Sequence, residues 1–340
     1  MLCNINLICK NISIFKLYYN MNLGSLQKNI KSINNHNHTH PFSYKNRFQG
    51  RFQNTQLKRV VNLYQMHYKN GIAQGFGDYL RGSFCLLQMA MLNNLKFDMN
   101  FVNHPIGEFL VIPQEQKEET IDFKNIYRYM PNNVEKMHKE FYTDFCDYLN
   151  LVRVPNYYLF CNSYPIAPIT NSQRRIILSK IMPTEELVSS IEEAERQLEL
   201  PVSYGVIHVR TGDQFILKNK KLDKITASSI FQQITKHISQ NKQYLLLSDN
   251  NQLKEYLSKN IPNIKVLINE ITHLGESARP NSTSVKNTLV DFFLMSKAKI
   301  IISFTINPHG TSFSEWCGKL YNIPYYCEML NISKKNWFSI

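Results

Sequence analysis

Short apolar runs alternate with amphipathic segments along the chain from about Arg59 onward. The short runs are bounded by polar or glycine-containing turns and predict strands, whereas the segments between them carry apolar residues at a helical spacing. We expect strands at 60–65, 95–101, 157–161, 204–209, 243–247, 264–268 and 299–303. We expect helices at 78–93, 134–149, 184–198, 227–239, 252–257 and 288–296. This alternation is typical of an α/β protein with mainly parallel sheets.

The extent of the pattern favours two lobes. The chain has 340 residues, and one compact domain commonly takes roughly 100–200. The segment 165–168, which begins and ends with proline, is typical of a linker, so we expect a first α/β lobe over 59–165 and a second over 166–340. Residues 1–58 contain no acidic residue, are rich in Asn, Lys and His, and show no sustained period. They predict a basic, disordered extension.

The net charge of +13 is concentrated near the N-terminal end. Ten of the 39 basic residues precede Asp78, the first acidic residue, which leaves 29 basic against 26 acidic residues from that position on. The patterned region is therefore nearly neutral, and we expect no nucleic-acid partner for it. Binding of nucleic acid by the extension stays an open alternative, although its basic residues are diluted by Asn and lack regular aromatic neighbours.

Cysteine usage and hydropathy bear on the compartment and on metals. The seven cysteines are scattered, with no C-x-x-C or other metal-ligand spacing. We therefore expect buried thiols, no metal site, and a reducing compartment in preference to a disulfide-stapled secreted domain. No apolar run of about 18 residues is present, so no membrane-spanning helix is predicted. Polar residues interrupt the apolar stretch 2–19, which makes it a poor signal peptide. We expect a cytoplasmic location, with organelle targeting or the secretory-pathway lumen left open.

Polar residues gather where three predicted strands of the second lobe end. The clusters are 208–213, 248–250 and 303–314. Ligands of open parallel sheets bind outside the carboxyl ends of the strands. Because parallel strands end at the same edge of a sheet, we expect the three clusters to form one binding site.

The cluster 208–213 predicts a phosphate contact. The period of two in a strand places His208 and Arg210 on one face and Val209 on the other. A guanidinium at this place can donate paired hydrogen bonds to a phosphate, which suits a diphosphate leaving group whose charge grows in the transition state. Asp213 can orient Arg210 or cap the segment that follows. The alternative, a strand that ends in a structural salt bridge, stays open.

A loop that leads into a helix follows the last of these strands. Ser312 and Glu315 have the S-x-x-E spacing of a capping box, and the remaining amides of the first helical turn can attract an anion. We expect a second phosphate contact at Thr311, Ser312, Phe313 and Ser314. An ordinary capped helix is the alternative.

Two further signals come from short motifs. Asp249 follows the second of the three strands, where its carboxylate can accept from the N–H groups of a purine, although the same residues can simply begin a helix. In the first lobe, Gly75 and Gly77 lie between a strand and a helix and let a ligand approach the backbone. Asp78 comes next, and it either faces the cleft between the lobes or caps the helix.

In their order along the chain these motifs resemble the fucosyltransferase superfamily, which contains the α1,2- and α1,6-fucosyltransferases and the protein O-fucosyltransferases. The similarity covers about residues 60–325. Its motifs are Gly75-Phe76-Gly77-Asp78, 208–213, Ser248-Asp249-Asn250, Asp291-Phe292-Phe293-Leu294-Met295-Ser296, Ile301-Ile302-Ser303 and Ser312-Phe313-Ser314-Glu315-Trp316. The resemblance implies a GT-B fold, with two Rossmann-like lobes, mainly parallel sheets and an interlobe cleft.

The resemblance also implies a function and a set of roles. The first lobe would take the acceptor, a glycan or a protein, and the second would bind the nucleotide sugar GDP-fucose. The sugar would pass to an acceptor hydroxyl with inversion, without a metal or another cofactor. Arg210 would hold the β-phosphate, His208 would lie near the nucleotide, and Asp249 would contact guanine. The amides of 311–314 would cradle the diphosphate, and Asp291 would support the fold.

One position departs from the family pattern. The glycine loop, which the resemblance places at the donor, ends in Asp78 where the family usually has Asn. A hydrogen-bond donor is thus replaced by a carboxylate, which repels a diphosphate if it points at one. A catalytically silent module that binds a nucleotide or glycan without turnover is therefore a second hypothesis beside the enzyme.

Overall fold

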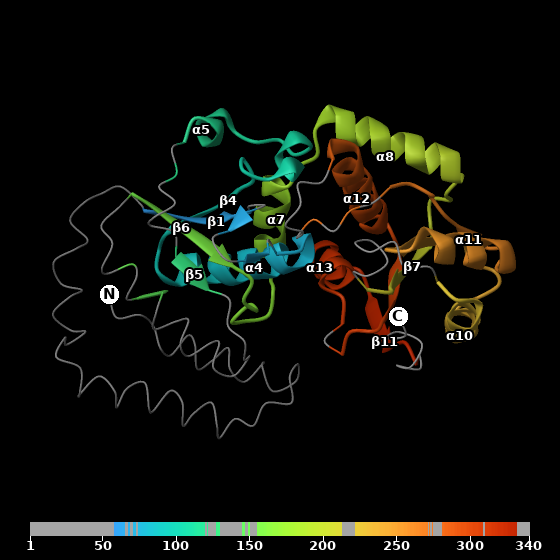
Figure 1. Ribbon diagram of the computed structural model, residues 1–340. Coiled ribbons are helices and arrows are strands. Elements are labelled where there is room, and N and C mark those ends of the chain that lie inside the picture. The colour runs from blue at the N-terminus through green and yellow to red at the C-terminus, as the bar shows by residue number, and fades with distance from the viewer. Residues whose placement is uncertain are drawn as a thin grey trace, which may run out of the picture. The chain divides into compact units, whose positions relative to one another are not determined.

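The computed structural model of the chain (Figure 1) describes residues 58–331 with several gaps. The gaps are 65–66, 69–70, 73, 120, 122–126, 130–144, 147–148, 150–154, 213–221, 271, 273, 275–280 and 309. Three predictions fall outside the described residues: the extension 1–58 apart from Lys58, most of the helix at 134–149, and Asp213.

The chain divides into two compact units that alternate along the sequence. The first holds the described residues up to Leu63, Arg81–Asn100 and Glu118–Arg175, and the second holds Tyr64–Leu80, Phe101–Lys117 and Ile176 onward. This division differs from the single boundary after residue 165 that the sequence predicts. Aromatic packing explains the difference, because Tyr64 stacks on His104 with 4.0 Å between ring centroids, and Phe76 meets Phe292 at 4.9 Å. These contacts place the early segments Tyr64–Leu80 and Phe101–Lys117 in the second unit.

A four-stranded parallel sheet of order β4-β1-β6-β5 forms the first unit. Its strands are β1 (Arg59–Leu63), β4 (Lys96–Asn100), β5 (Tyr127–Tyr129) and β6 (Asn156–Cys161). The sequence predicted all of them except β5. The predicted first helix is α4 (Phe76–Leu92), in which Cys85 and Met89, one turn apart, are buried with Val60 and Leu159 of the sheet.

The second unit is built on a five-stranded parallel sheet of order β11-β10-β7-β8-β9. Its strands are β7 (Gly205–Arg210), β8 (Tyr244–Ser248), β9 (Ile264–Lys265), β10 (Ile300–Thr305) and β11 (Tyr325–Met329). β9 is shorter than predicted, and β11 was not predicted. The register pairs Arg210 with Thr305 and Val209 with Ser248, so β7, β8 and β10 end at one edge, as the sequence predicts.

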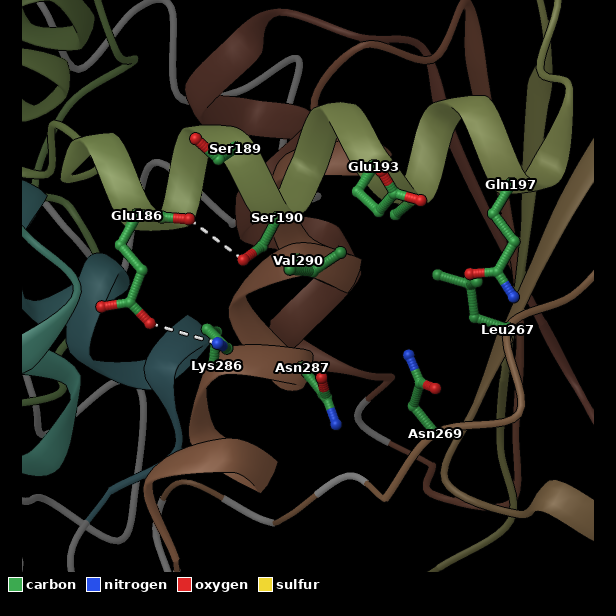
Figure 2. Close-up of a pocket in the computed structure, with 11 residues that line it drawn as sticks. Glu186, Ser189, Ser190, Glu193, Gln197, Leu267, Asn269, Lys286, Asn287 and Val290 are labelled. Carbon is green, nitrogen blue, oxygen red and sulfur yellow. Dashed lines mark hydrogen bonds and ion pairs between the residues drawn. The ribbon is translucent and has the colours of Figure 1, made fainter.

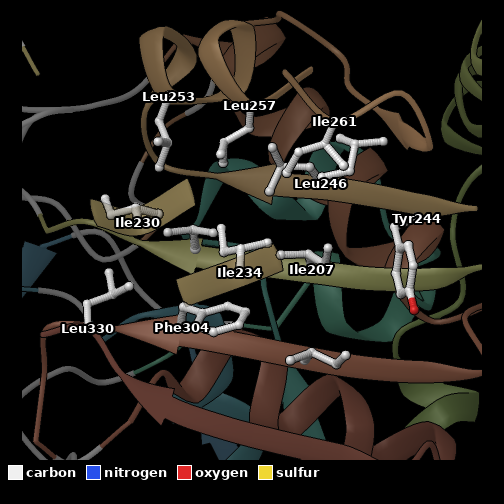
Figure 3. Packing of buried hydrophobic residues seen from close by; sticks show 13 residues of the cluster. Ile207, Ile230, Ile234, Tyr244, Leu246, Leu253, Leu257, Ile261, Phe304 and Leu330 are labelled. Atoms are coloured by element: carbon white, nitrogen blue, oxygen red, sulfur yellow. The ribbon is translucent and has the colours of Figure 1, made fainter. Parts of the chain in front are cut away.

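Helices cover both faces of this second sheet. On one face α10 (Lys224–Thr235) and α11 (Asn251–Asn260) bury Ile230 and Leu253 against the apolar side chains of β7 and β8 (Figure 3). On the other face lies α13 (Ser312–Tyr321), whose Ser314 hydroxyl is hydrogen-bonded to the hydroxyl of Ser303 in β10. Because side chains alternate along a strand, His208 points to the α13 side.

Other short and long elements complete the described chain. They are β2 (His67–Tyr68), β3 (Gly71–Ile72), the 3-10 helix η1 (Pro105–Glu108), α5 (Gln114–Lys117), α7 (Asn171–Lys180), α8 (Glu185–Leu198) and α12 (Ser282–Met295). The helix predicted at 184–198 is α8, and Thr184 caps it by accepting from the Leu187 amide. α12 starts earlier than the predicted residue 288 because Asn281 accepts from the Ser284 amide at 2.7 Å.

The structure bears on two expectations from the sequence, namely that the thiols are buried and that no helix spans a membrane. In the part of the chain that the structure describes, the five cysteines form no disulfide, and all but Cys327 are buried. None of the described helices has the length and apolar character needed to cross a membrane.

The fit between α4 and the end of β6 depends on Gly82. A β-carbon at this position would lie 1.7 Å from the carbonyl oxygen of Cys161. A backbone carbonyl cannot swing aside as a flexible side chain can, so any side chain here forces the helix away from the sheet.

We predict that Gly82→Ala destabilises the protein by about 2 kcal/mol or more, because the added methyl overlaps backbone atoms. Urea unfolding followed by circular dichroism measures the loss. Gly318→Ala is the matched control, since it also adds a methyl within a helix but meets its nearest atoms at 3.3 Å. Its effect should stay within about 1 kcal/mol, and equal losses in the two variants would contradict this view of the packing.

Candidate functional site

The strand order of the second sheet identifies the edge at which a ligand can bind. From β7 the chain runs outward through β8 and β9, and then crosses to β10 and β11 on the other side of β7. This reversal leaves a crevice beyond the carboxyl ends of β7 and β10, which is where open parallel sheets bind ligands. A cavity of about 270 Å³ lies there.

The walls of this cavity come from the second unit alone. They are formed by Gly75, Phe76, Gly77, Asp78, His208, Arg210, Leu247, Ser248, Asp249, Thr272, Leu274, Thr288, Asp291, Asn307, Gly310, Thr311, Ser312 and Phe313. All of the predicted site residues line it except Ser314, which lies behind His208, and Asp213, which lies outside the described residues.

Arg210 is the cationic side chain of the described wall, and it is held in place by Asp249. Its Nη1 donates to Oδ2 of Asp249 at 2.5 Å, and its side chain is 15% exposed. The same carboxylate accepts from the amide and hydroxyl of Thr211 at 2.8 and 2.6 Å and from the amide of Gly212 at 2.8 Å. Gly212 has a φ of +113°, which favours glycine. Asp249, predicted to contact a purine, thus uses both oxygens to fix the end of β7.

His208 presents a neutral imidazole to the cavity. Its Nδ1 is hydrogen-bonded to Oγ of Ser314 at 2.9 Å, and that hydroxyl is hydrogen-bonded to Oγ of Ser303 at 2.7 Å. Burial lowers the pKa of His208 to about 4, with the neighbouring Asp249 and Arg210 acting in opposite directions. The ring is therefore uncharged at neutral pH, and the two serines set its orientation.

The first turn of α13 lines the cavity with Thr311, Ser312 and Phe313. Thr311 is the N-cap residue, and its side chain makes no cap hydrogen bond among the described residues. The predicted capping box is wrong, because Ser312 is the first helical residue and its hydroxyl donates to Asp78 at 2.7 Å, while Glu315 pairs with Lys319. The amides at this end carry the positive end of the helix dipole, so the turn favours an anion.

The glycine loop before α4 packs against this same turn. A β-carbon on Gly77 would lie 2.2 Å from the carbonyl group of Ser312 and 2.6 Å from the amide nitrogen of Phe313. Only glycine permits this approach of the two helix starts. The loop thus acts through the packing of α4 on α13, and Asp78 is a residue of the first turn of α4 and not its N-cap.

Asp291 lines the cavity, whereas the resemblance implied that it only supports the fold. It makes no hydrogen bond or ion pair with another described residue, and burial raises its pKa to about 6 against the opposing effect of Lys254. Lys254 is itself buried and donates to the carbonyl of Leu267 at 2.7 Å. The three-residue spacing of Thr288 and Asp291 on α12, both of which line the cavity, is a signal that could have placed them on one face.

A larger hollow of about 500 Å³ lies between α8 and α12 and the segment around Leu267 (Figure 2). Its charged groups already have ion-pair partners, since Lys286 pairs with Glu186 at 3.1 Å and Glu193 pairs with Arg196 at 2.5 Å. The hollow lies against helix flanks and away from the strand ends of the sheet. It is therefore a weaker candidate for a ligand site than the cavity at the end of β7.

The described residues of the cavity suit an organic anion. They combine a fixed guanidinium, a helix start that favours negative charge, and a neutral imidazole. Within the described residues, no group of three or more His, Cys, Asp or Glu side chains is arranged to hold a metal ion.

Comparison with known proteins finds similarity in fold. Neither a protein-family model nor a curated protein matches the sequence. A mutant of FUT1 from Arabidopsis thaliana, solved in complex with GDP, aligns with a TM-score of 0.51 at 10% identity over 80% of this chain and 70% of that one. NodZ α-1,6-fucosyltransferase co-crystallised with GDP aligns at 0.48 with 14% identity over 77% and 92% of the two chains. POFUT1 in complex with GDP aligns at 0.45 with 11% identity over 82% and 99%.

The alignment with the plant protein shows the fold. The chain shares the α/β fold of that protein and has two parallel sheets, which confirms the fold class predicted from the motifs. The interlobe cleft of that prediction, the activity, and the roles of individual residues stay predictions.

The raised pKa of Asp291 has a consequence for stability. Between its ordinary value of 3.8 and about 6, the native chain keeps a proton on Asp291 that the unfolded chain has released. This residue therefore makes the native state less stable as the pH rises through that window. We predict that the stability of Asp291→Asn, relative to the wild type, increases between pH 4 and pH 7 by on the order of 1–3 kcal/mol.

Urea unfolding at several pH values measures this difference. The comparison with the wild type removes the opposite pH dependence of His104 and His208, whose pKa values burial lowers to about 4. Glu192→Gln on the exposed face of α8 serves as the control and should give a flat difference. A flat or falling difference for Asp291→Asn would show that the carboxylate is not buried as described.

Proposed function

We propose that this chain is a fucosyltransferase that takes fucose from GDP-fucose and transfers it to an acceptor hydroxyl with inversion at the anomeric carbon. The observation that carries the proposal is the meeting of Arg210 and the first turn of α13 on one cavity at the switch point of the sheet. The fold supports it, and so does the GDP bound in the plant protein of similar fold.

Arg210 and the start of α13 would stabilise the departing diphosphate. As the bond from the anomeric carbon to the phosphate oxygen breaks, its electron pair stays on that oxygen and negative charge grows there. A guanidinium and helix-start amides that are already oriented stabilise such charge without reorganisation. Asp249 provides this orientation for Arg210 through the bonds at the end of β7.

The nucleobase would lie toward Asp291 and His208. Guanine presents neighbouring N–H donors, which a carboxylate can accept in pairs. The resemblance gives this role to Asp249, but both oxygens of that carboxylate already accept from Arg210, Thr211 and Gly212. We therefore assign guanine to Asp291, whose carboxylate lines the same cavity.

A silent binding module remains the second candidate. Asp78, with its carboxylate on the cavity wall beside α13, is the observation in its favour. Release of free fucose from GDP-fucose by the purified chain separates the two, because a silent module binds the donor without turnover. An acceptor, whether glycan or protein, would be sought only after such release is seen.

We predict that GDP and GDP-fucose raise the thermal stability of the wild-type chain, whereas UDP and UDP-sugars do not. A ligand at 100 times its Kd adds about 2.7 kcal/mol to the stability of the native state. Arg210→Lys keeps the charge but loses the paired hydrogen bonds, and Arg210→Ala loses both, so the GDP shift should fall in that order.

Arg196→Ala is the control for this series, because Arg196 lies exposed on α8 and pairs with Glu193. It should leave the GDP shift as in the wild type. The proposal fails if no guanine nucleotide stabilises the wild type, or if the shift in Arg210→Ala is undiminished.

A further inference from the structure

His208, Ser314 and Ser303 form a buried row of hydrogen bonds beside the cavity. Ser303 on β10 is paired in register with His208 on β7, so both side chains point to the α13 side of the sheet. The hydroxyl of Ser314 lies between them, at 2.9 Å from Nδ1 of His208 and 2.7 Å from Oγ of Ser303. Both serines are fully buried, so their hydroxyl hydrogens need acceptors inside the protein.

The direction of this row decides which ring nitrogen of His208 carries the hydrogen. A serine hydroxyl has one hydrogen to donate, so Ser314 donates either to Nδ1 or to Ser303. If it donates to Nδ1, Ser303 donates to Ser314, and both serine hydrogens are bonded. If it donates to Ser303, Nδ1 must carry the ring hydrogen, and the hydrogen of Ser303 needs another acceptor. The bond made by one ring nitrogen thus sets the state of the other.

The hydroxyl of Tyr325 on β11 lies near the two serines and is a poor acceptor for that hydrogen. Burial raises the pKa of Tyr325, and the hydroxyls of Ser303 and Ser314 oppose this effect. The Tyr325 hydroxyl nevertheless makes no hydrogen bond of ordinary geometry with a described residue. A buried donor without an acceptor costs about 1–3 kcal/mol. The arrangement in which Ser314 donates to Nδ1 is therefore the more stable one.

Nε2 is the ring nitrogen of His208 that remains for a ligand. Ser314 occupies Nδ1, Nε2 makes no hydrogen bond with a described residue, and the side chain lines the cavity. Because burial lowers the pKa of His208 to about 4, the ring carries a single hydrogen at neutral pH. With Nδ1 accepting from Ser314, this hydrogen lies on Nε2.

We propose that Ser314, supported by Ser303, holds His208 as the tautomer with its hydrogen on Nε2, so that His208 donates a hydrogen bond to the bound nucleotide. This inference rests on the proposed function. Ser314 and Ser303 are then positioning residues, which act through the imidazole. The shared chemistry on the ligand is an acceptor atom, either of the nucleoside or of the diphosphate.

This tautomer also excludes His208 as the base of the transfer. A nitrogen that carries a hydrogen has no lone pair to offer, so Nε2 cannot take the proton of the acceptor hydroxyl. In the transfer, the acceptor oxygen bonds the anomeric carbon, its proton passes to water, and the phosphate oxygen keeps the electron pair of the broken bond. His208 contributes a donor that adds no charge to the cavity.

Nitrogen NMR of the ligand-free protein, labelled at its histidine rings, measures the tautomer. A ring nitrogen without a hydrogen resonates far downfield of one that carries a hydrogen, and the spectrum of His208→Gln identifies the signals of His208. We expect the hydrogen on Nε2 in the wild type. In Ser314→Ala, which removes the donor to Nδ1, the fraction with the hydrogen on Nδ1 should rise.

Ser303→Ala is the matched control, because it removes a hydroxyl from the same row but leaves Ser314 to donate to Nδ1. The hydrogen should stay on Nε2 in this variant. If the row ran the other way, Ser303 would be the acceptor for Ser314, and its loss would change the tautomer.

Two substitutions of His208 separate a donor from a base. The side-chain amide of glutamine can donate a hydrogen bond but cannot take a proton, and leucine can do neither. We expect the Kd of GDP, measured by calorimetry, to rise about tenfold in His208→Leu and about two- to threefold in His208→Gln. Release of fucose from GDP-fucose should fall in the same order.

Addition of ligand to the labelled wild type identifies the acceptor atom. A change of the Nε2 signal with guanosine as well as GDP would assign the acceptor to the nucleoside. A change with GDP alone would assign it to the diphosphate. An Nε2 signal that does not move when GDP binds would overturn the inference.

Other outcomes overturn the inference and leave the proposed function standing. They are a hydrogen on Nδ1 in the wild type, a tautomer that responds to Ser303→Ala but not to Ser314→Ala, and equal losses of fucose release in His208→Gln and His208→Leu. If the wild type binds no guanine nucleotide, the proposed function fails and the donor role fails with it. The tautomer of the ligand-free protein is measured independently of that result.

Discussion

The carboxylate of Asp249 holds the end of β7 in one conformation. It accepts from the guanidinium of Arg210, from the amide and hydroxyl of Thr211, and from the amide of Gly212. A hydrogen bond to a charged acceptor contributes about 1.5–3 kcal/mol, and an arginine side chain loses about 2 kcal/mol of rotamer entropy when it is fixed. Several such bonds outweigh that cost, so the guanidinium is ordered before a ligand arrives.

Two further contacts bring the anion-binding turn to the same place. Ser314 joins α13 to the sheet through its hydrogen bonds to His208 and Ser303. Gly77 lets α4 begin against the first turn of α13. Contacts within the protein thus hold the guanidinium, the first turn of α13 and the neutral imidazole at one cavity. A site of this kind binds charge with little reorganisation.

The strand ends could be predicted from the sequence because their cause is local. β7, β8 and β10 are buried on both faces, and such strands read as continuous apolar runs that stop where polar residues begin. The topology rule for parallel sheets then brings Arg210, Asp249 and the entry to α13 together. The two glycines indicated the loop before α4 as part of the site. The sequence did not reveal that this loop packs against the first turn of α13.

The features that sequence reasoning missed depend on distant contacts. Ser312 has the spacing of a capping residue, but Asp78, 234 residues earlier, takes its hydroxyl. Asp291 lies on a helix that is buried nearly all round, so the apolar period does not reveal which face meets the cavity. The grouping of Tyr64 with His104 in one compact unit likewise depends on their stacking, a tertiary contact that no local sequence pattern contains.

A crystal structure of the protein with GDP tests the central claim most directly, since that claim concerns where a nucleoside diphosphate binds. The diphosphate should lie within hydrogen-bond distance of the Arg210 guanidinium and of the first-turn amides of α13, with the base toward Asp291 and Asp249 still bonded to Arg210. A nucleotide in the hollow between α8 and α12, or one whose phosphates point away from Arg210, would contradict it.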